Sequence, residues 1–148
     1  MKKIFFALLA CCAVAQIRAA DVTWLTDVPK AEQQAKTDNK LVLLDFTGSD
    51  WCGPCKALEK DTFEQPEFAD YAAKNLVLVQ LDYPQHKEQS KELEDANAAL
   101  AKKYDIEGFP TLIALKPDGT VAWKQVGYLE GGPKALIAKL DNLDGAKK

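Results

Sequence analysis

The sequence predicts an α/β protein with a mixed central β-sheet and helices on both faces of the sheet. Two continuous apolar runs, 41–46 and 76–81, have the pattern of strands that are buried on both faces. Segments with helical spacing of apolar residues alternate with these strands. The segments 111–115 and 120–127, joined by a tight turn, are expected to pair as an antiparallel hairpin. Helices that alternate with strands, with the hairpin before the last helix, give a sheet of this kind.

The first helix is expected from Asp27 to Asn39, because Asp27 suits the N-cap and Pro29 falls in the first turn. The strand 41–46 follows at once. Its one acidic residue, Asp45, stands among apolar side chains. That position marks Asp45 as a candidate functional group.

A loop of residues 47–50 leads from this strand into a second helix, which is expected to begin around Cys52. Pro54 falls in its first turn, where the missing N–H of proline has no intrahelical partner to lose. The apolar side of this helix and of a following helical turn consists of Leu58, Phe63, Phe68 and Tyr71.

A long helix is expected after Tyr83-Pro84, and a last helix after the break at Gly131-Gly132-Pro133. The long helix carries one face made of Leu93, Ala96, Asn97, Leu100, Ala101 and Tyr104. The last helix carries inward-facing Leu136, Ile137, Leu140 and Leu143.

The first twenty residues have the order of a secretory signal peptide, with Lys2 and Lys3 before an apolar run and small residues after it. We expect a signal peptide at 1–20 and a single globular domain at 21–148. Residues 13–15 are an alternative match to a cleavage motif, and Cys11 leaves lipidation as a further alternative. The apolar run is shorter than the roughly 20 residues that span a bilayer, so the mature protein is expected to be exported and soluble.

The net charge of −3 becomes more negative when the basic residues of the signal segment are removed. This balance indicates neither a nucleic-acid partner nor an anionic membrane partner. A monomer is expected.

Cysteine usage is more informative than charge. Of the four cysteines, two lie in the signal segment and two, Cys52 and Cys55, remain. This number is too small for a disulfide-stapled scaffold. An inert structural bridge and a zinc site stay open as alternatives, although a zinc site has only His86 as a histidine ligand, so neither a metal nor a cofactor is expected.

Cys52 and Cys55 lie three residues apart at a strand-to-helix junction, with Cys52 expected at the exposed end of the helix. The helix dipole there favours an anion and lowers the pKa of the Cys52 thiol. A fall from about 8.5 to about 7 raises reactivity only about threefold, because a weaker base is a weaker nucleophile. Substrate positioning and a resolving thiol must therefore contribute.

Cys55 lies deeper in the helix and needs a base. Asp45 is the candidate, because burial in an apolar strand raises the pKa of a carboxyl group. The alternative is a partly exposed aspartate at the strand end without this role.

Two further stretches bear on substrate binding. Trp51 directly precedes Cys52, a position suited to shielding the thiolate or contacting a substrate. In Gly108-Phe109-Pro110-Thr111, a proline before a strand is compatible with a cis peptide bond, although a trans bond is the default on sequence alone.

Taken together, these motifs resemble the thioredoxin superfamily. They are Leu44-Asp45-Phe46, Trp51-Cys52-Gly53-Pro54-Cys55-Lys56, Phe109-Pro110-Thr111 and Pro117-Asp118-Gly119, in the order of that family. The loop before Cys52 and the segment Glu59-Lys60-Asp61-Thr62-Phe63 are similar to exported members and to the C-terminal domain of transmembrane disulfide reductases.

The resemblance implies a thioredoxin fold in which Cys52 attacks, Cys55 resolves and Asp45 is the buried acid. It also implies that Pro110 is a cis-proline lining the substrate groove, and that the backbone of Phe109 bonds an extended peptide. The expected substrate-binding residues are Trp51, Gly53, Pro54, Phe109 and Pro110.

The sequence departs from ordinary thioredoxins in three places. The loop before Cys52 is one residue longer, and the segment 83–96 is extended, which is expected to lengthen the helix that follows. Gln80 stands where thioredoxins often place a lysine near the buried acid.

The resulting hypothesis is an exported enzyme that reduces protein disulfides. Gly53-Pro54 lacks the histidine that stabilises the thiolate in oxidising relatives. The expected partners are client proteins with disulfides and a membrane-embedded electron donor. A disulfide oxidase or isomerase, or a non-catalytic thioredoxin-fold binding module, remains as an alternative.

Overall fold

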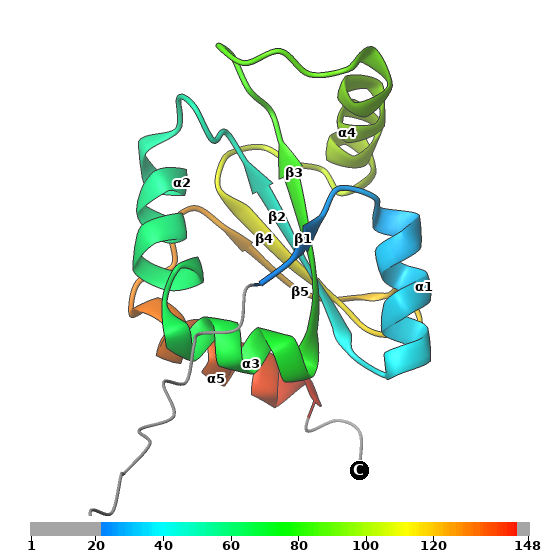
Figure 1. The fold of residues 1–148 in the computed structure, drawn as a ribbon, viewed down its shortest axis with the longest axis vertical. Coiled ribbons are helices and arrows are strands. Elements are labelled where there is room, and N and C mark those ends of the chain that lie inside the picture. Colours follow the sequence, from blue (N-terminus) through cyan, green and yellow to red (C-terminus); the bar gives the residue numbers. More distant parts are fainter. Residues whose placement is uncertain (1–21, 145–148) are drawn as a thin grey trace, which may run out of the picture.

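Five strands form one mixed sheet in the described residues, 22–144, of this computed structural model (Figure 1). Their order across the sheet is β1-β3-β2-β4-β5. β2 and β1 both run parallel to β3, whereas β4 is antiparallel to β2 and β5 to β4. The strands are β1 (Trp24–Leu25), β2 (Leu41–Thr47), β3 (Leu76–Asp82), β4 (Thr111–Leu115) and β5 (Val121–Val126). The predicted mixed sheet is confirmed.

The edge strand β1 was not predicted. It pairs only Trp24 and Leu25 with β3. A strand of two residues has no alternation of apolar and polar side chains, so only its tertiary partners define it. Trp24 packs against Phe63 and Phe68, with ring centroids 5.0 and 6.4 Å away.

Helices cover both faces of the sheet, as predicted (Figure 1). Side chains of α1 and α4 pack on one face, and those of α2, η1, α3 and α5 pack on the other. The helices are α1 (Val28–Asp38), α2 (Gly53–Leu58), the π-helical turn η1 (Glu59–Phe63), α3 (Pro66–Asn75), α4 (Lys91–Lys103) and α5 (Gly132–Asp144).

The central strand β2 is buried along its whole length. Because successive strand residues point to opposite faces, Val42 and Leu44 join the core under α1, whereas Leu41 and Leu43 join the core under α3 and α5. Full burial of one such side chain stabilises the fold by about 1.5–3 kcal/mol. β2 is therefore a firm base for the loop that follows it.

The predicted N-cap of the first helix is confirmed, since the Asp27 carboxylate accepts the Lys30 N–H at 2.9 Å. The second helix differs from the expectation. Its predicted course is divided into α2, the π-helical turn η1 and α3, and π-helical turns are frequent beside functional sites.

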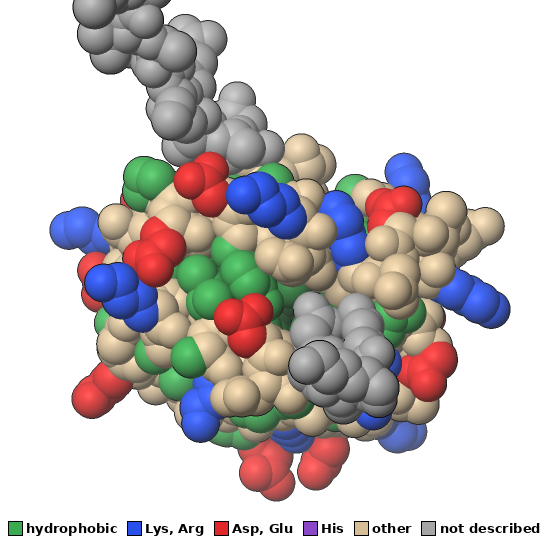
Figure 2. Space-filling view, turned by 90° about the horizontal axis from the view of Figure 1, so that it is seen from below, with side chains coloured by type: hydrophobic (Ala, Val, Ile, Leu, Met, Phe, Trp, Pro, Cys, Tyr) green, Lys and Arg blue, Asp and Glu red, His purple; other side chains and the backbone are tan. Residues whose placement is uncertain are grey.

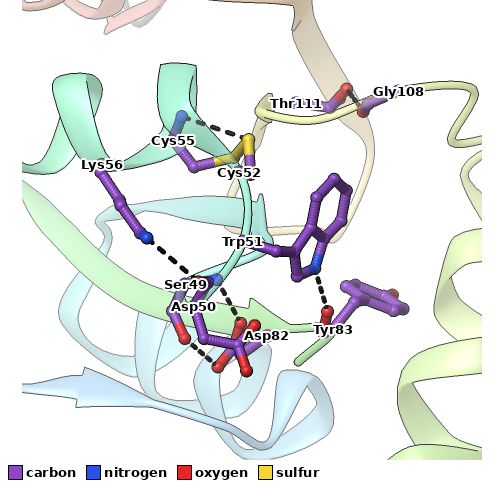
Figure 3. Close-up of a disulfide and its surroundings, with 10 residues drawn as sticks. All are labelled: Ser49, Asp50, Trp51, Cys52, Cys55, Lys56, Asp82, Tyr83, Gly108 and Thr111. Carbon is purple, nitrogen blue, oxygen red and sulfur yellow. Dashed lines mark hydrogen bonds between the residues drawn. A yellow bond between two sulfur atoms is a disulfide. The ribbon is translucent and has the colours of Figure 1, made fainter. Parts of the chain in front are cut away.

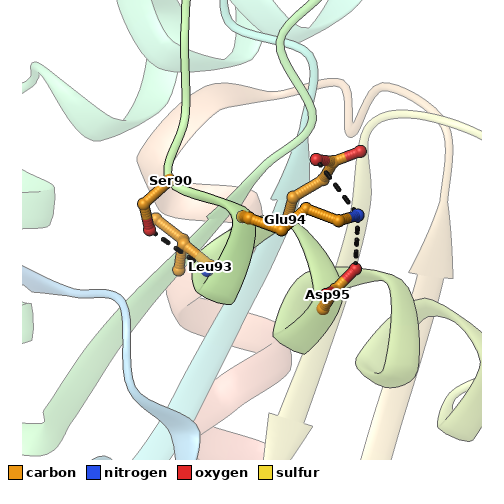
Figure 4. Close-up of polar contacts among 5 residues, drawn as sticks. Ser90, Leu93, Glu94 and Asp95 are labelled. Carbon is orange, nitrogen blue, oxygen red and sulfur yellow. Dashed lines mark hydrogen bonds and ion pairs between the residues drawn. The ribbon is translucent and has the colours of Figure 1, made fainter.

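The extension after β3 forms a loop, residues 83–90, rather than a longer helix. α4 begins only at Lys91, where the Ser90 hydroxyl accepts the Leu93 N–H at 3.3 Å (Figure 4). The Lys91 ammonium lies 2.7 Å from Asp95 and 3.6 Å from Glu94. The long helix expected after Tyr83-Pro84 therefore begins later than predicted, because Ser90 caps it at Lys91.

Figure 2 shows the molecule from below, on the side of α3 and α5, where acidic and basic side chains are interspersed around an apolar area. The hydroxyl of Tyr71 on α3 donates to Asp141 on α5 at 2.8 Å. None of the described helices is both long and apolar enough to cross a membrane. The predicted signal peptide with its cleavage site, together with Cys11 and Cys12, lies outside the described residues.

Candidate active site

The two cysteines stand where β2 leads into α2. Cys52 is the N-cap of α2, with extended backbone angles (φ −84°, ψ 107°), and Pro54 lies in the first turn. The Cys52 Sγ accepts the backbone N–H of Cys55 at 3.2 Å. The sulfur therefore occupies the place of a capping oxygen, at the end of the helix that favours negative charge.

Cys52 and Cys55 form a disulfide, with their Cα atoms 5.3 Å apart (Figure 3). The expected small-ring bridge is thereby confirmed. The expected exposure of Cys52 is wrong in this oxidised state, because both cysteines are only 4% exposed. The Cys52 sulfur is bonded to Cys55 and accepts the Cys55 N–H instead of facing solvent.

Asp45 is buried in the middle of the sheet, 2% exposed, between Gln80 of β3 and Leu112 of β4. Its Oδ1 has no hydrogen-bond partner among the described residues. Loss of hydration, followed by the negative charge of Glu59, raises the pKa of Asp45 to about 8. The predicted burial of Asp45 is confirmed and the expected partial exposure of the alternative is wrong, whereas its role as the base for Cys55 stays a prediction.

A pocket opens beside Cys55 on the side of Gln80, and it is lined by Thr47, Ser49, Cys55, Lys56, Glu59, Glu64 and Gln80. Glu59 is half-buried here, and its pKa is raised by desolvation and by the charge of Glu64. The sequence analysis missed Glu59 as a neighbour of Asp45. Only the packing of η1 against the sheet brings these two carboxyl groups within electrostatic reach.

The segment 108–111 passes beside the disulfide (Figure 3). The Phe109–Pro110 bond is cis, as the resemblance implies. Thr111 Oγ1 donates to the Gly108 carbonyl at 2.7 Å, and the Pro110 carbonyl accepts the Gly127 N–H at 2.8 Å. These two bonds fix the segment at the start of β4.

The remaining predicted substrate-binding residues surround the cysteines. Trp51 is 37% exposed, and Gly53 and Pro54 are exposed at the start of α2. The rings of Trp51 and Phe109 meet edge to face, with centroids 5.7 Å apart. The structure thus brings Trp51 and Phe109 together.

Three polar residues near the site were not predicted. Ser49 donates its N–H and its hydroxyl to the Asp82 carboxylate, and Asp50 accepts backbone N–H groups from the loop 83–90. The extra length of the loop before Cys52 was the only sequence signal. Its bonding partners lie more than thirty positions further along the chain.

Within residues 22–144, no three side chains of His, Cys, Asp or Glu are placed to share a metal ion. His86 is exposed and contributes its backbone N–H to Asp50.

This arrangement is suited to thiol-disulfide exchange. Breaking the disulfide between two cysteines at the start of a helix takes up two electrons, and forming it again releases them. The fold and the site define a thiol-disulfide oxidoreductase of the thioredoxin type. The chain belongs to the thioredoxin-like domain family, which matches residues 28–144.

Individual relatives agree with this class. The chain is 32% identical over 124 residues to the disulfide bond reductase DsbH of Chlamydia pneumoniae, covering 84% of this chain and 74% of that protein. A solved structure of a DsbH oxidoreductase matches with a TM-score of 0.78 at 30% identity, covering 88% of this chain and 91% of that one. The thiol:disulfide interchange protein DsbD of Pseudomonas fluorescens is 32% identical over 90 residues, which span 61% of this chain and 14% of DsbD. The resemblance to disulfide reductases is confirmed.

Proposed function

We propose that the protein is exported and reduces disulfides in other proteins through a cycle of the Cys52 and Cys55 thiols. The observation that carries this proposal is the Cys52 sulfur at the N-cap of α2, where it accepts the Cys55 N–H at 3.2 Å. A thiolate formed there on reduction is stabilised by the same N–H group and by the helix dipole. Gly53-Pro54 adds no histidine between the cysteines.

In the first step, the Cys52 thiolate attacks one sulfur of the client disulfide. The client S–S bond breaks, a mixed disulfide forms, and the departing client thiolate takes a proton from solvent. Trp51, Gly53 and Pro54 are exposed around Cys52 and can contact the client chain. The backbone of Phe109 is the proposed hydrogen-bonding partner of an extended client segment.

In the second step, the Cys55 thiol transfers its proton to Asp45 and attacks the Cys52 sulfur. The mixed disulfide breaks, the second client thiolate leaves and is protonated, and the Cys52–Cys55 disulfide is restored. Near neutral pH, a carboxyl group whose pKa is about 8 is deprotonated in a minor fraction of the molecules, and in that form it accepts the Cys55 proton and later returns it to solvent. The client has gained two electrons and two protons, and the enzyme has lost them.

A new cycle needs two electrons from a thiol donor. In an exported protein these electrons must come across the membrane, so we propose a membrane-embedded dithiol protein as the donor. The similarity to the interchange protein DsbD supports this class of partner.

The direction of electron flow is tested by equilibrating the protein with glutathione. A potential near that of thioredoxin, about −270 mV, is expected, and a value near the −120 mV of strongly oxidising relatives would contradict a reductase. Reduction of insulin disulfides should be lost in Cys52→Ser. If Cys52→Ser and Cys55→Ser leave the biological activity of the protein intact, the result would contradict a reductase and favour a non-catalytic binding module.

Export and partners are tested in cells. The mass of the mature protein should show that the first twenty residues are removed, and detection of the full-length chain in the cytoplasm would argue against export. Cys55→Ser leaves Cys52 unresolved, so it should accumulate mixed disulfides with both clients and donor.

A further inference from the structure

The carboxylate of Asp50 connects the loop before Cys52 to the loop 83–90 by hydrogen bonds. Asp50 Oδ1 accepts the N–H of Gln85 at 3.0 Å, and Oδ2 accepts the N–H of His86 at 2.6 Å. Slight desolvation raises the pKa of Asp50, but these bonds and the charge of His86 outweigh it, so the pKa lies below its ordinary value. Because each oxygen bonds one of two consecutive N–H groups, the carboxylate fixes the direction of the loop backbone.

Asp82, at the end of β3, makes a second tie. Its Oδ1 accepts the Ser49 N–H at 2.8 Å and its Oδ2 accepts the Ser49 hydroxyl at 2.6 Å (Figure 3). Its carbonyl accepts the side-chain amides of Asn97 at 2.9 Å and Gln89 at 3.2 Å. Asp82 therefore links the loop before Cys52 to the loop 83–90 and to α4.

Trp51 is held by the same loop. Its indole N–H donates to the Tyr83 carbonyl at 2.8 Å (Figure 3). The Phe109 ring lies against both, with centroids 5.7 Å from Trp51 and 5.1 Å from Tyr83. The residue that precedes Cys52 is thus oriented by the loop 83–90 and by the segment that holds the cis-proline.

We propose that the loop 83–90 is one wall of the binding site for protein substrates, and that Asp50 and Asp82 are positioning residues that hold this wall and Trp51 beside the disulfide. Residues 85–88 are exposed, so the wall offers polar side chains and backbone groups to a client chain. This proposal implies that a small disulfide can react with Cys52 without contacting the loop 83–90, whereas an extended protein segment would contact the loop. This inference rests on the proposed reductase function.

The test compares one large and one small disulfide substrate. For Asp50→Ala, we expect KM for insulin to rise about fivefold or more, with kcat changed less than about twofold, because substrate binding loses a fixed surface. The rate with 5,5′-dithiobis(2-nitrobenzoate) should change less than about twofold. Asp50→Asn keeps one acceptor oxygen and should give a smaller rise in KM.

A matched control is Asp118→Asn. Asp118 is exposed, whereas Asp50 is half-buried, and like Asp50 it accepts two hydrogen bonds, here from the N–H of Thr120 at 3.0 Å and its hydroxyl at 2.6 Å, but it lies in the turn between β4 and β5. This variant should leave the KM for insulin and the rate with 5,5′-dithiobis(2-nitrobenzoate) unchanged. Amide hydrogen exchange at Gln85 and His86 should accelerate in the Asp50 variants and not in Asp118→Asn.

The outcomes separate the wall from the reductase function. Equal losses of activity with both substrates in the Asp50 variants would contradict the proposed role of the loop 83–90. An unchanged KM for insulin while the Gln85 and His86 amides exchange faster would contradict it as well. If Asp50→Ala does not fold, the isosteric Asp50→Asn decides by the same criteria. A wild-type protein that reduces neither substrate would instead refute the proposed function.

Discussion

Asp45 and Gln80 lie side by side in register on the parallel strands β2 and β3, so the buried carboxyl group has an uncharged amide as its cross-strand neighbour. Gln80 lowers the pKa of Asp45, but desolvation and the charge of Glu59 are stronger and bring the pKa to about 8. The folded protein therefore keeps a proton that an unfolded aspartate releases near its ordinary value of 3.8. Asp45 therefore makes the folding stability of the protein depend on pH.

Between about pH 4 and pH 8, the folded state binds more protons at Asp45 than the unfolded state does. The contribution of Asp45 to the free energy of unfolding must therefore fall as pH rises, by up to about 1.4 kcal/mol per pH unit. Asp45→Asn removes this dependence, so the variant should gain stability over the wild type as pH increases. Urea titrations of the oxidised proteins at several pH values measure the difference, and parallel pH profiles would contradict the raised pKa.

Asp45→Asn should also separate the two steps of the proposed cycle. Release of the mixed disulfide needs deprotonated Cys55, whereas its formation depends on Cys52, which is bonded to a backbone N–H. Loss of a general base typically slows a step by a factor of about 100 or more. Stopped-flow measurements should show that release slows far more than formation. Equal slowing of both steps would remove Asp45 from the mechanism.

Gln80→Lys should lower the pKa of Asp45 by about one to three units, because a neighbouring cation favours the carboxylate. Gln80 is half-buried and lines the pocket beside Cys55, so an ammonium group there can keep contact with solvent. Carboxyl titration by NMR measures the shift. Gln80→Met, of similar length and without charge, is the control, and an equal fall in pKa in both variants would argue against an electrostatic cause.

The fold was predictable to the extent that local pattern determines it. The apolar runs of β2 and β3 and the capping residue Asp27 carry their structural preference in a few adjacent residues. β1 and the loop 83–90 do not, because β1 exists through its pairing with β3 and the loop through its bonds to the loop before Cys52.

The candidate site divides in the same way. The cysteine pair and the cis-proline segment are short motifs, and they were found where the resemblance implies. Asp50 is one residue in a polar loop, and nothing adjacent to it indicates that its carboxylate bonds the N–H groups of Gln85 and His86. Such contacts between distant segments depend on the sheet order that brings the two loops together.

Gly48→Ala should release Trp51 from its position. A Cβ atom at Gly48 would come within 2.7 Å of three indole atoms of Trp51, so the ring must move and lose its bond to the Tyr83 carbonyl. The indole N–H resonance of Trp51 should shift and exchange faster with solvent. Gly53→Ala is the steric control, since no atom lies within 4 Å of its added Cβ. An unchanged Trp51 resonance in Gly48→Ala would contradict this packing.

Thr62 and Thr111 provide a matched pair for the cost of a buried hydroxyl, because both residues are 0% exposed. Thr111 Oγ1 donates to the Gly108 carbonyl at 2.7 Å, whereas Thr62 Oγ1 has no partner among the described residues. Valine has nearly the same shape as threonine. Thr62→Val should therefore stabilise the protein by about 1 kcal/mol, since an unpaired buried hydroxyl is removed.

Thr111→Val should instead destabilise the protein by about 1–2 kcal/mol, because it leaves the Gly108 carbonyl without this donor. Urea denaturation of the two oxidised variants at one pH measures both changes. The opposite signs follow from hydrogen bonding alone, since burial and the change of side chain are the same at both positions. Destabilisation of similar size in both variants would mean that the Thr62 hydroxyl is satisfied in the folded protein.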